Sequence, residues 1–235
     1  MNTKKNNVTV EHGLRTAATR VSYGVGMMLL VMDVGNTNIE LGLYKADQLQ
    51  HHWRIHTNRN ATADEYAIIV KNLLRDKAIS AASIHGVAIA TVVPPLKHVL
   101  YNMCHRHLNL EPLVVGPGVK TGLNIKYENP REVGADRIVN AVAAIHTYGT
   151  PTVIVDFGTA TTFCLVDEQG DYLGGVIAPG MAVAAEALVS RAAQLSWFEI
   201  AKPDHILGRN TIKALQSGTY YGYVGQVDGI VGRLQ

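Results

Sequence analysis

One short sequence motif occurs twice in this chain, each time at the end of a run of apolar residues, and the repeat indicates the fold. The first reads Leu29-Leu30-Val31-Met32-Asp33-Val34-Gly35-Asn36-Thr37-Asn38, and the second reads Val153-Ile154-Val155-Asp156-Phe157-Gly158-Thr159-Ala160-Thr161-Thr162. A glycine lets the backbone approach a phosphate closely, and turn N–H groups can then hydrogen-bond the phosphate oxygens. The acid has the chemistry that holds Mg²⁺, usually through water. The pair therefore predicts two loops that clamp a nucleotide.

The residues that follow each copy of the motif predict a repeated order of strands and helices. After the first phrase we expect strands at 39–44, 49–56, 84–90 and 113–115 and helices at 63–77 and 94–108. We expect a helix at 134–148 before the second copy of the motif. The pattern then restarts with strands at 152–156, 161–166 and 172–178, a helix at 181–193 and a helical stretch at 211–234. The first copy therefore has the order β-β-β-α-β-α-β.

This repeat predicts an α/β protein with a duplicated ribonuclease-H-like (actin-like) fold, as in the sugar-kinase superfamily of ATPases. We expect a first half over 28–133 and a second half over 134–235. The second half is expected to be incomplete at the C-terminus, because no fourth or fifth strand follows the last helix. An incomplete half would leave an uncovered sheet edge.

The rest of the sequence narrows the class of protein. Residues 1–27 lack the apolar core of a signal peptide and are expected to be a disordered leader or an upstream start, with a transit peptide as the alternative. The net charge of +2 gives no reason to expect nucleic acid as a partner, and no apolar run is long enough to span a membrane. Cys104 and Cys164 are expected to be free thiols in a reducing compartment, the cytoplasm, with one disulfide as the alternative.

A third motif, Gly134-Ala135-Asp136-Arg137, places a carboxylate and a guanidinium side by side at the start of a predicted helix. The exposed N–H groups and the dipole of a helix N-terminus favour an acid there. Alone, the motif is more simply a helix-capping acid with a surface arginine. Next to two phosphate loops, it becomes the candidate for chemistry.

In this order, five motifs closely resemble those of the type III pantothenate kinases, which start coenzyme A synthesis. The motifs are Asp33 to Asn38, Gly134 to Arg137, Asp156 to Thr162, Gly174 to Gly180, and Gly208-Arg209-Asn210-Thr211. The resemblance extends from Met28 to the last residue. It implies an ATP-dependent phosphotransferase that forms 4'-phosphopantothenate, works as a homodimer, and needs Mg²⁺ and a monovalent cation, K⁺ or NH₄⁺.

The resemblance also implies a role for individual residues. The ATP-binding residues would be Asp33, Val34, Gly35, Asn36, Thr37, Asn38, Ile39, Glu40 and Thr159. The pantothenate-binding residues would be Tyr127, Gly134, Ala135, Asp136, Arg137 and Thr211. Asp136 would be the catalytic base that accepts the hydroxyl proton. Asp33 would lie near Mg²⁺ through water, and Asp156 would be a ligand of the monovalent cation.

Two alternatives stand beside the pantothenate kinase. A catalytically silent relative, acting as a regulatory or interaction protein, is favoured by the expected missing strands. The retained charged residues Asp33, Asp136, Arg137 and Asp156 disfavour it. Another small-alcohol kinase of the same superfamily is disfavoured by Tyr127 together with Gly134 to Arg137. Losing a general base typically slows a reaction about 10²–10⁴-fold, so a base at Asp136 is open to a direct test.

Overall fold

The structure is a computed structural model, and it describes residues 27–116 and 118–235. The chain divides into two compact units. Of the described residues, the first unit comprises those up to Thr152 together with Asp167–Tyr172, and the second comprises Val153–Val166 and Leu173–Gln235.

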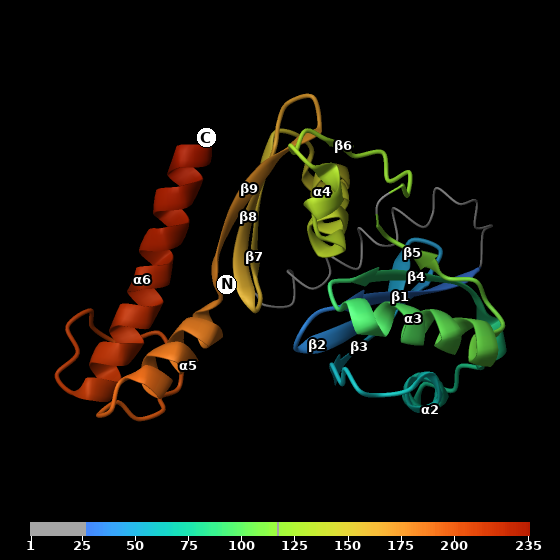
Figure 1. The fold of residues 1–235 in the computed structure, drawn as a ribbon, viewed down its shortest axis with the longest axis horizontal. Coiled ribbons are helices and arrows are strands. Elements are labelled where there is room, and N and C mark those ends of the chain that lie inside the picture. Colours follow the sequence, from blue (N-terminus) through green and yellow to red (C-terminus); the bar gives the residue numbers. More distant parts are fainter. Residues whose placement is uncertain (1–26, 117) are drawn as a thin grey trace. The chain divides into compact units, whose positions relative to one another are not determined.

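The first unit contains a sheet of five strands in the order β3-β2-β1-β4-β5 (Figure 1). The strands are β1 (Met28–Val34), β2 (Asn38–Lys45), β3 (Gln48–His56), β4 (Ile84–Thr91) and β5 (Leu113–Val114). β1 is antiparallel to β2 and parallel to β4, and β4 is parallel to β5. The carboxyl ends of β1, β4 and β5 therefore lie at one edge of the sheet.

Helices α2 (Ala63–Asp76) and α3 (Pro94–Met103) pack side by side on one face of this sheet (Figure 1). Their buried side chains share a core with alternate residues of β1 such as Leu30 and Met32. The odd-numbered residues Leu29 and Val31 point to the opposite face, as the two-residue period of a strand requires, and they are buried as well. Asp33 continues that odd-numbered row.

A capping box fixes the first residue of α2. The Thr62 hydroxyl accepts a hydrogen bond from the Glu65 N–H at 3.3 Å, and the Thr62 N–H donates to Glu65 Oε2 at 2.7 Å. The Thr62 hydroxyl and the Glu65 carboxylate thus each accept a hydrogen bond from a backbone N–H that a helix N-terminus leaves unpaired. The Glu65 carboxylate has a lowered pKa because it accepts hydrogen bonds from Thr62. The cap anchors the segment that leads from β3 into α2.

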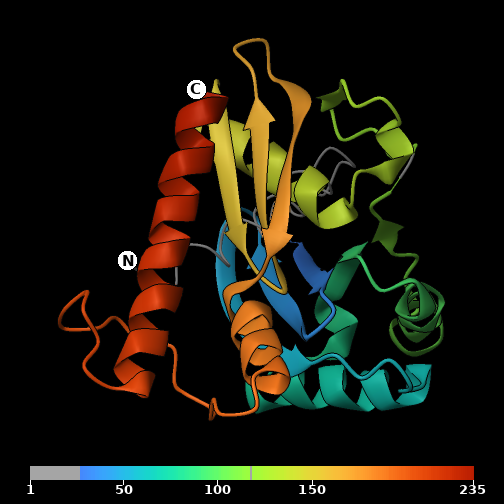
Figure 2. The same ribbon diagram turned by 60° about the vertical axis from the view of Figure 1, so that its left-hand side comes forward.

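The second unit is built on β7 (Thr152–Phe157), β8 (Ala160–Val166) and β9 (Asp171–Pro179), which are drawn in yellow and orange in Figure 2. They belong to a four-stranded sheet in the order β6-β9-β8-β7. Helices α5 (Met181–Arg191) and α6 (Thr211–Leu234) follow in sequence and both contact β8. Gly175 permits close strand packing, because a Cβ there would overlap the Phe163 carbonyl oxygen.

The strand β6 (Asn124–Ile125) was not predicted. Its two residues pair in parallel with Asp171 and Tyr172, and the Asn124 side-chain amide donates to Asp171 Oδ1 at 2.7 Å. Lys126 adds a backbone hydrogen bond to the Tyr172 carbonyl at 2.8 Å. These distant partners define β6, because its own two residues carry no strand pattern.

The predicted order of elements is confirmed, including α4 (Ala135–Tyr148), α5 and α6. The predicted leader, residues 1–27, lies outside the described residues except for Met27. The division of the chain into halves at residue 134, with an incomplete second half, stays a prediction.

Both cysteines are buried free thiols, and burial raises the pKa of the Cys104 thiol to about 12. Within the described part of the chain, we find no helix with the length and apolar character of a membrane span.

Candidate active site

The first predicted phosphate loop is a tight turn between β1 and β2. The Gly35 N–H donates to the Asn38 carbonyl at 3.0 Å, so Gly35 to Asn38 form a closed loop with Asn36 and Thr37 exposed at its tip. A Cβ at Gly35 would lie 3.1 Å from the Asn38 oxygen. The glycine therefore allows this close approach, as expected for a loop that presents backbone N–H groups to an anion.

The residue that follows β3, Thr57, holds this loop in place through hydrogen bonds. Thr57, which is only 5% exposed, donates its N–H to the Thr37 carbonyl at 2.9 Å and its hydroxyl to the Gly35 carbonyl at 2.7 Å. Thr57 fixes the loop through both its backbone and its side chain. Thr57 was not predicted, because a single threonine after a strand carries no recognisable signal.

The last predicted residue of the loop, Glu40, is a strand residue. It lies in β2 directly opposite Asp33 on one side and Arg54 on the other. Its carboxylate accepts a hydrogen bond from Arg54 and lies 2.7 Å from His52 Nε2. Glu40 is therefore engaged with β3 in this structure, and its predicted contact with ATP stays a prediction.

The loop and the Gly134–Arg137 motif lie close to each other at the carboxyl edge of the first sheet. The Val92 N–H, just beyond β4, donates to the Val34 carbonyl at 3.1 Å. A Cβ on Gly134 would lie 3.7 Å from Val92 Cγ1, so the motif packs against the same residue. Val92 thus brings the start of α4 to the end of β1. Ligands of open α/β sheets bind at such edges.

Asp136 occupies the first turn of α4. Its Oδ1 accepts a hydrogen bond from the Arg137 N–H at 2.8 Å. A side chain at Gly134 would collide with the same oxygen, so the missing Cβ makes room for the carboxylate. The predicted motif therefore has a physical basis: the glycine creates the space that the acid occupies.

The surroundings of Asp136 change its acidity. Burial raises the pKa of this carboxyl above its ordinary value, and the Arg137 N–H and guanidinium oppose the shift without cancelling it. A general base works best when its pKa lies close to the working pH. A half-buried carboxyl with a raised pKa, at the edge of a sheet, is suited to accepting a proton.

Arg137 links two aromatic residues that are far apart in sequence. Its guanidinium carbon lies 5.9 Å from the centre of the Tyr127 ring and 5.7 Å from the centre of the Tyr172 ring, and the residue is 7% exposed. Both distances are within the range of cation–π attraction. Tyr127, predicted to bind substrate, is thus held next to the Gly134–Arg137 motif. Tyr172 was missed, because only the fold brings it to Arg137.

The second unit holds the other predicted residues, Asp156 and Thr159. Asp156 lies near the end of β7, and the Gly158 N–H donates to the Ala160 carbonyl at 3.0 Å to form a tight turn. The Gly180 N–H donates to the Thr159 carbonyl at 3.0 Å, and a Cβ on Gly180 would overlap the carbonyl oxygens of Gly158 and Thr159. The Gly158 and Thr159 carbonyl oxygens therefore lie close together against Gly180, in the turn that follows Asp156 along the chain.

Thr211 is the first residue of α6 and is exposed. The Asn210 side chain caps this helix by accepting a hydrogen bond from the Lys213 N–H at 2.9 Å. Gly208 lies so close to the first turn that a Cβ would overlap the Ala214 backbone. The predicted Gly208–Thr211 motif is thus a turn and cap that place Thr211 at a helix start.

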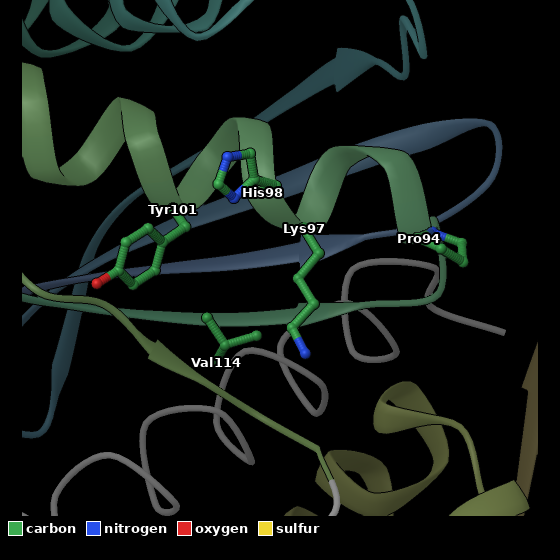
Figure 3. Close-up of a pocket in the computed structure, with 5 residues that line it drawn as sticks. All are labelled: Pro94, Lys97, His98, Tyr101 and Val114. Carbon is green, nitrogen blue, oxygen red and sulfur yellow. The ribbon is translucent and has the colours of Figure 1, made fainter.

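Figure 3 shows a pocket of ≈ 350 Å³ elsewhere in the first unit. Its lining residues come from α3 and β5, and they are Pro94, Lys97, His98, Tyr101 and Val114. None of them is a predicted site residue. The pocket therefore gives no independent support to the predicted site.

A five-stranded sheet in this order, with a tight glycine turn after its first strand, is the predicted ribonuclease-H-like (actin-like) architecture. The sequence profile described as type III pantothenate kinase matches residues 29–233. The chain belongs to the type III pantothenate kinase family.

Individual relatives agree with this assignment. The chain is 57% identical over 208 residues to the type III pantothenate kinase of Geobacillus sp. (strain WCH70), covering 88% of this chain and 81% of that protein. It is 58% identical over 207 residues to that of Brevibacillus brevis (strain 47 / JCM 6285 / NBRC 100599), with the same coverage of 88% and 81%.

One solved structure supports the fold. It is described as a Baf family transcriptional activator from Campylobacter jejuni, with a TM-score of 0.54 and 20% identity over 86% of this chain and 78% of that one. The family membership identifies the reaction as ATP-dependent phosphorylation of pantothenate, the first step of coenzyme A synthesis.

Proposed function

We propose that Asp136 is the general base of this pantothenate kinase and that the Asp33–Glu40 segment binds the phosphates of ATP. The observation that carries the proposal is the Asp136 carboxyl, which is half-buried, has a raised pKa and lies in the space left by Gly134. The base accepts the proton of the primary hydroxyl of pantothenate as the hydroxyl oxygen attacks the γ-phosphate. Phosphoryl transfer needs positioning and neutralisation of charge more than covalent chemistry.

Pantothenate is proposed to contact Tyr127, Gly134, Ala135, Asp136 and Arg137 in the first unit. A contact with Thr211 stays what the family resemblance implies. Arg137 supplies a buried positive charge held between two tyrosine rings, which suits an acceptor that carries a carboxylate. Because its guanidinium is fixed by packing, it orients the acceptor with little loss of side-chain entropy.

Asp33 is proposed to hold Mg²⁺ through water. Mg²⁺ in kinases usually keeps several waters and binds one or two carboxylates together with substrate phosphates. The half-buried Asp33 at the end of β1 fits that pattern. No group of three His, Cys, Asp or Glu side chains in the described residues could enclose a metal without substrate. When bound, Mg²⁺ neutralises charge on the phosphates.

Asp156 is proposed to bind a monovalent cation, K⁺ or NH₄⁺. Such cations take oxygen ligands, and the Gly158 and Thr159 carbonyl oxygens crowd the space that a Gly180 side chain would fill. A carboxylate together with backbone carbonyl oxygens from the turn that follows it is a suitable donor set for such a cation. Thr159, in the same turn, is proposed to contact ATP.

Replacing Asp156 by asparagine is expected to remove the dependence of turnover on K⁺, because the amide has no charge to hold the cation. The measurement is kcat in K⁺ and in Na⁺ at constant ionic strength, for wild type and variant. The exposed Asp204→Asn is the matched control and should respond to K⁺ as wild type does. Undiminished K⁺ stimulation of the Asp156 variant would remove Asp156 from the cation site.

The assembly and the location of the enzyme are also proposals. We propose a homodimer, as in the family that the motifs resemble, and a cytoplasmic enzyme, because its substrate ATP is there. The apolar side chains exposed on the second unit, among them Ile177, Trp197 and Leu207, are compatible with a protein contact. Sedimentation of the purified chain tests the dimer.

A further inference from the structure

Arg59 lies next to the first phosphate loop, although no motif includes it. Its Nη2 donates to Asn36 Oδ1 at 2.8 Å, and Asn36 is at the exposed tip of that loop. Arg59 is on the segment between β3 and α2, more than twenty residues further along the chain, so the fold alone brings the two together.

The backbone around Arg59 is firmly held. Two residues earlier, Thr57 bonds to the carbonyls of Gly35 and Thr37. The neighbouring Asn58 donates its N–H to the Tyr66 hydroxyl at 3.2 Å, and that hydroxyl donates back to the Asn58 carbonyl at 2.9 Å. The Asn60 N–H donates to Asn58 Oδ1 at 3.0 Å. Arg59 is therefore presented to the loop from a fixed position.

The charge of Arg59 has no acidic partner in the described part of the chain. Its hydrogen bond to Asn36 uses one of the five N–H donors of a guanidinium. By contrast, Arg54, five residues earlier, pairs with Glu40. An exposed guanidinium fixed over a phosphate loop, with most of its donors available, is the arrangement that binds phosphate oxygens.

We propose that Arg59 binds the phosphate chain of ATP and is a second guanidinium of the active site besides Arg137. The proposal rests on the proposed role of the Gly35–Asn38 loop in ATP binding. In this proposal the positive charge of Arg59 provides the attraction to the phosphates, and Asn36 only orients the guanidinium. A purely structural role would instead need the hydrogen bond to Asn36 and no charge.

Three substitutions separate these roles in the full chain. Arg59→Ala removes both the charge and the hydrogen bond, Arg59→Gln keeps an N–H donor for Asn36 without charge, and Arg59→Lys keeps the charge. Arg75→Ala is the matched control, because Arg75 is also an exposed arginine whose Nη2 donates to an asparagine, Asn72 Oδ1 at 2.9 Å. The probe is ATP with Mg²⁺, titrated by calorimetry without pantothenate, and KM for ATP is measured separately.

We expect the Ala and Gln variants to bind ATP about tenfold to a hundredfold more weakly, the range expected for a lost charge-assisted hydrogen bond. The Lys variant should recover part of the loss, and Arg75→Ala should match wild type. Circular dichroism should show all four variants folded. ATP affinity of Arg59→Gln equal to that of the Arg75 control would overturn the proposal.

The binding titration also separates this inference from the proposed function. A wild type that binds ATP but does not phosphorylate pantothenate would contradict the acceptor chemistry and leave the Arg59 result valid. A wild type that does not bind ATP would overturn both the loop assignment and the role of Arg59.

Discussion

Replacing Asp136 by asparagine is expected to lower kcat about 10²–10⁴-fold, the usual effect of losing a general base. Asparagine has nearly the same shape and can still accept the hydrogen bond from the Arg137 N–H. The affinity for ATP should therefore stay within about threefold of wild type, because the lost interaction acts only in the transition state. The measurements are steady-state kinetics and a binding titration with ATP.

The chain offers a close control for this substitution. Asp64 follows an alanine in the first turn of α2 as Asp136 does in α4, but its side chain is exposed and lies 2.6 Å from His107 Nε2. Asp64→Asn should leave kcat unchanged. If the Asp136 variant kept near-normal turnover, the assignment of the base would be wrong.

The raised pKa of Asp136 predicts the direction of the pH dependence. The base acts in its deprotonated form, so turnover should fall as the pH is lowered through the folded-state pKa. Because burial raises that pKa, the acidic limb should lie above the ordinary value of an aspartate. The limb should be absent from the residual activity of the Asp136 variant.

Gly180→Ala is expected to have the second large effect. The Gly180 backbone angles, φ −68° and ψ 154°, are open to any residue, so only the added methyl group matters. It would overlap the carbonyl oxygens of Gly158 and Thr159, which are backbone atoms and cannot rotate away. Such overpacking costs about 1–3 kcal/mol and would displace the turn next to Asp156. We expect lower thermal stability and loss of most K⁺-stimulated turnover.

A glycine without neighbours serves as the control for Gly180. A Cβ on Gly218, inside α6, would meet no atom within 4 Å. Gly218→Ala should therefore leave activity intact and stabilise the helix by about 0.5–1 kcal/mol, because alanine loses less backbone entropy than glycine on folding. Thermal unfolding and turnover of both variants make the comparison. Equal behaviour of the two would refute the steric argument.

The sequence predicted the elements of the fold because their signals are local. The apolar runs of β1 and β7 each end in an acid and a glycine turn. Helices α2 and α4 have an apolar face, and α3 has a proline at its start. β6 could not be predicted, since two residues become a strand only by pairing with Asp171 and Tyr172. Its partner strand is more than forty residues further along the chain.

The candidate site was predictable where a contact lies within one motif. Gly134 makes room for Asp136 two residues later, and Gly35 closes its loop onto Asn38. Contacts between distant residues left no sequence signal. Thr57 behind the loop and Tyr172 against Arg137 follow only from the way strands and helices pack.

Phosphorylation of pantothenate by this chain can be measured as the release of ADP from ATP by the purified protein. The assay compares pantothenate with a panel of sugars, with Mg²⁺ present, in K⁺ and then in Na⁺ alone. We expect ADP release that requires pantothenate and is much faster in K⁺. Three results would contradict pantothenate kinase activity: ADP release that does not depend on pantothenate, ADP release that depends on a sugar, or no ADP release from a folded chain.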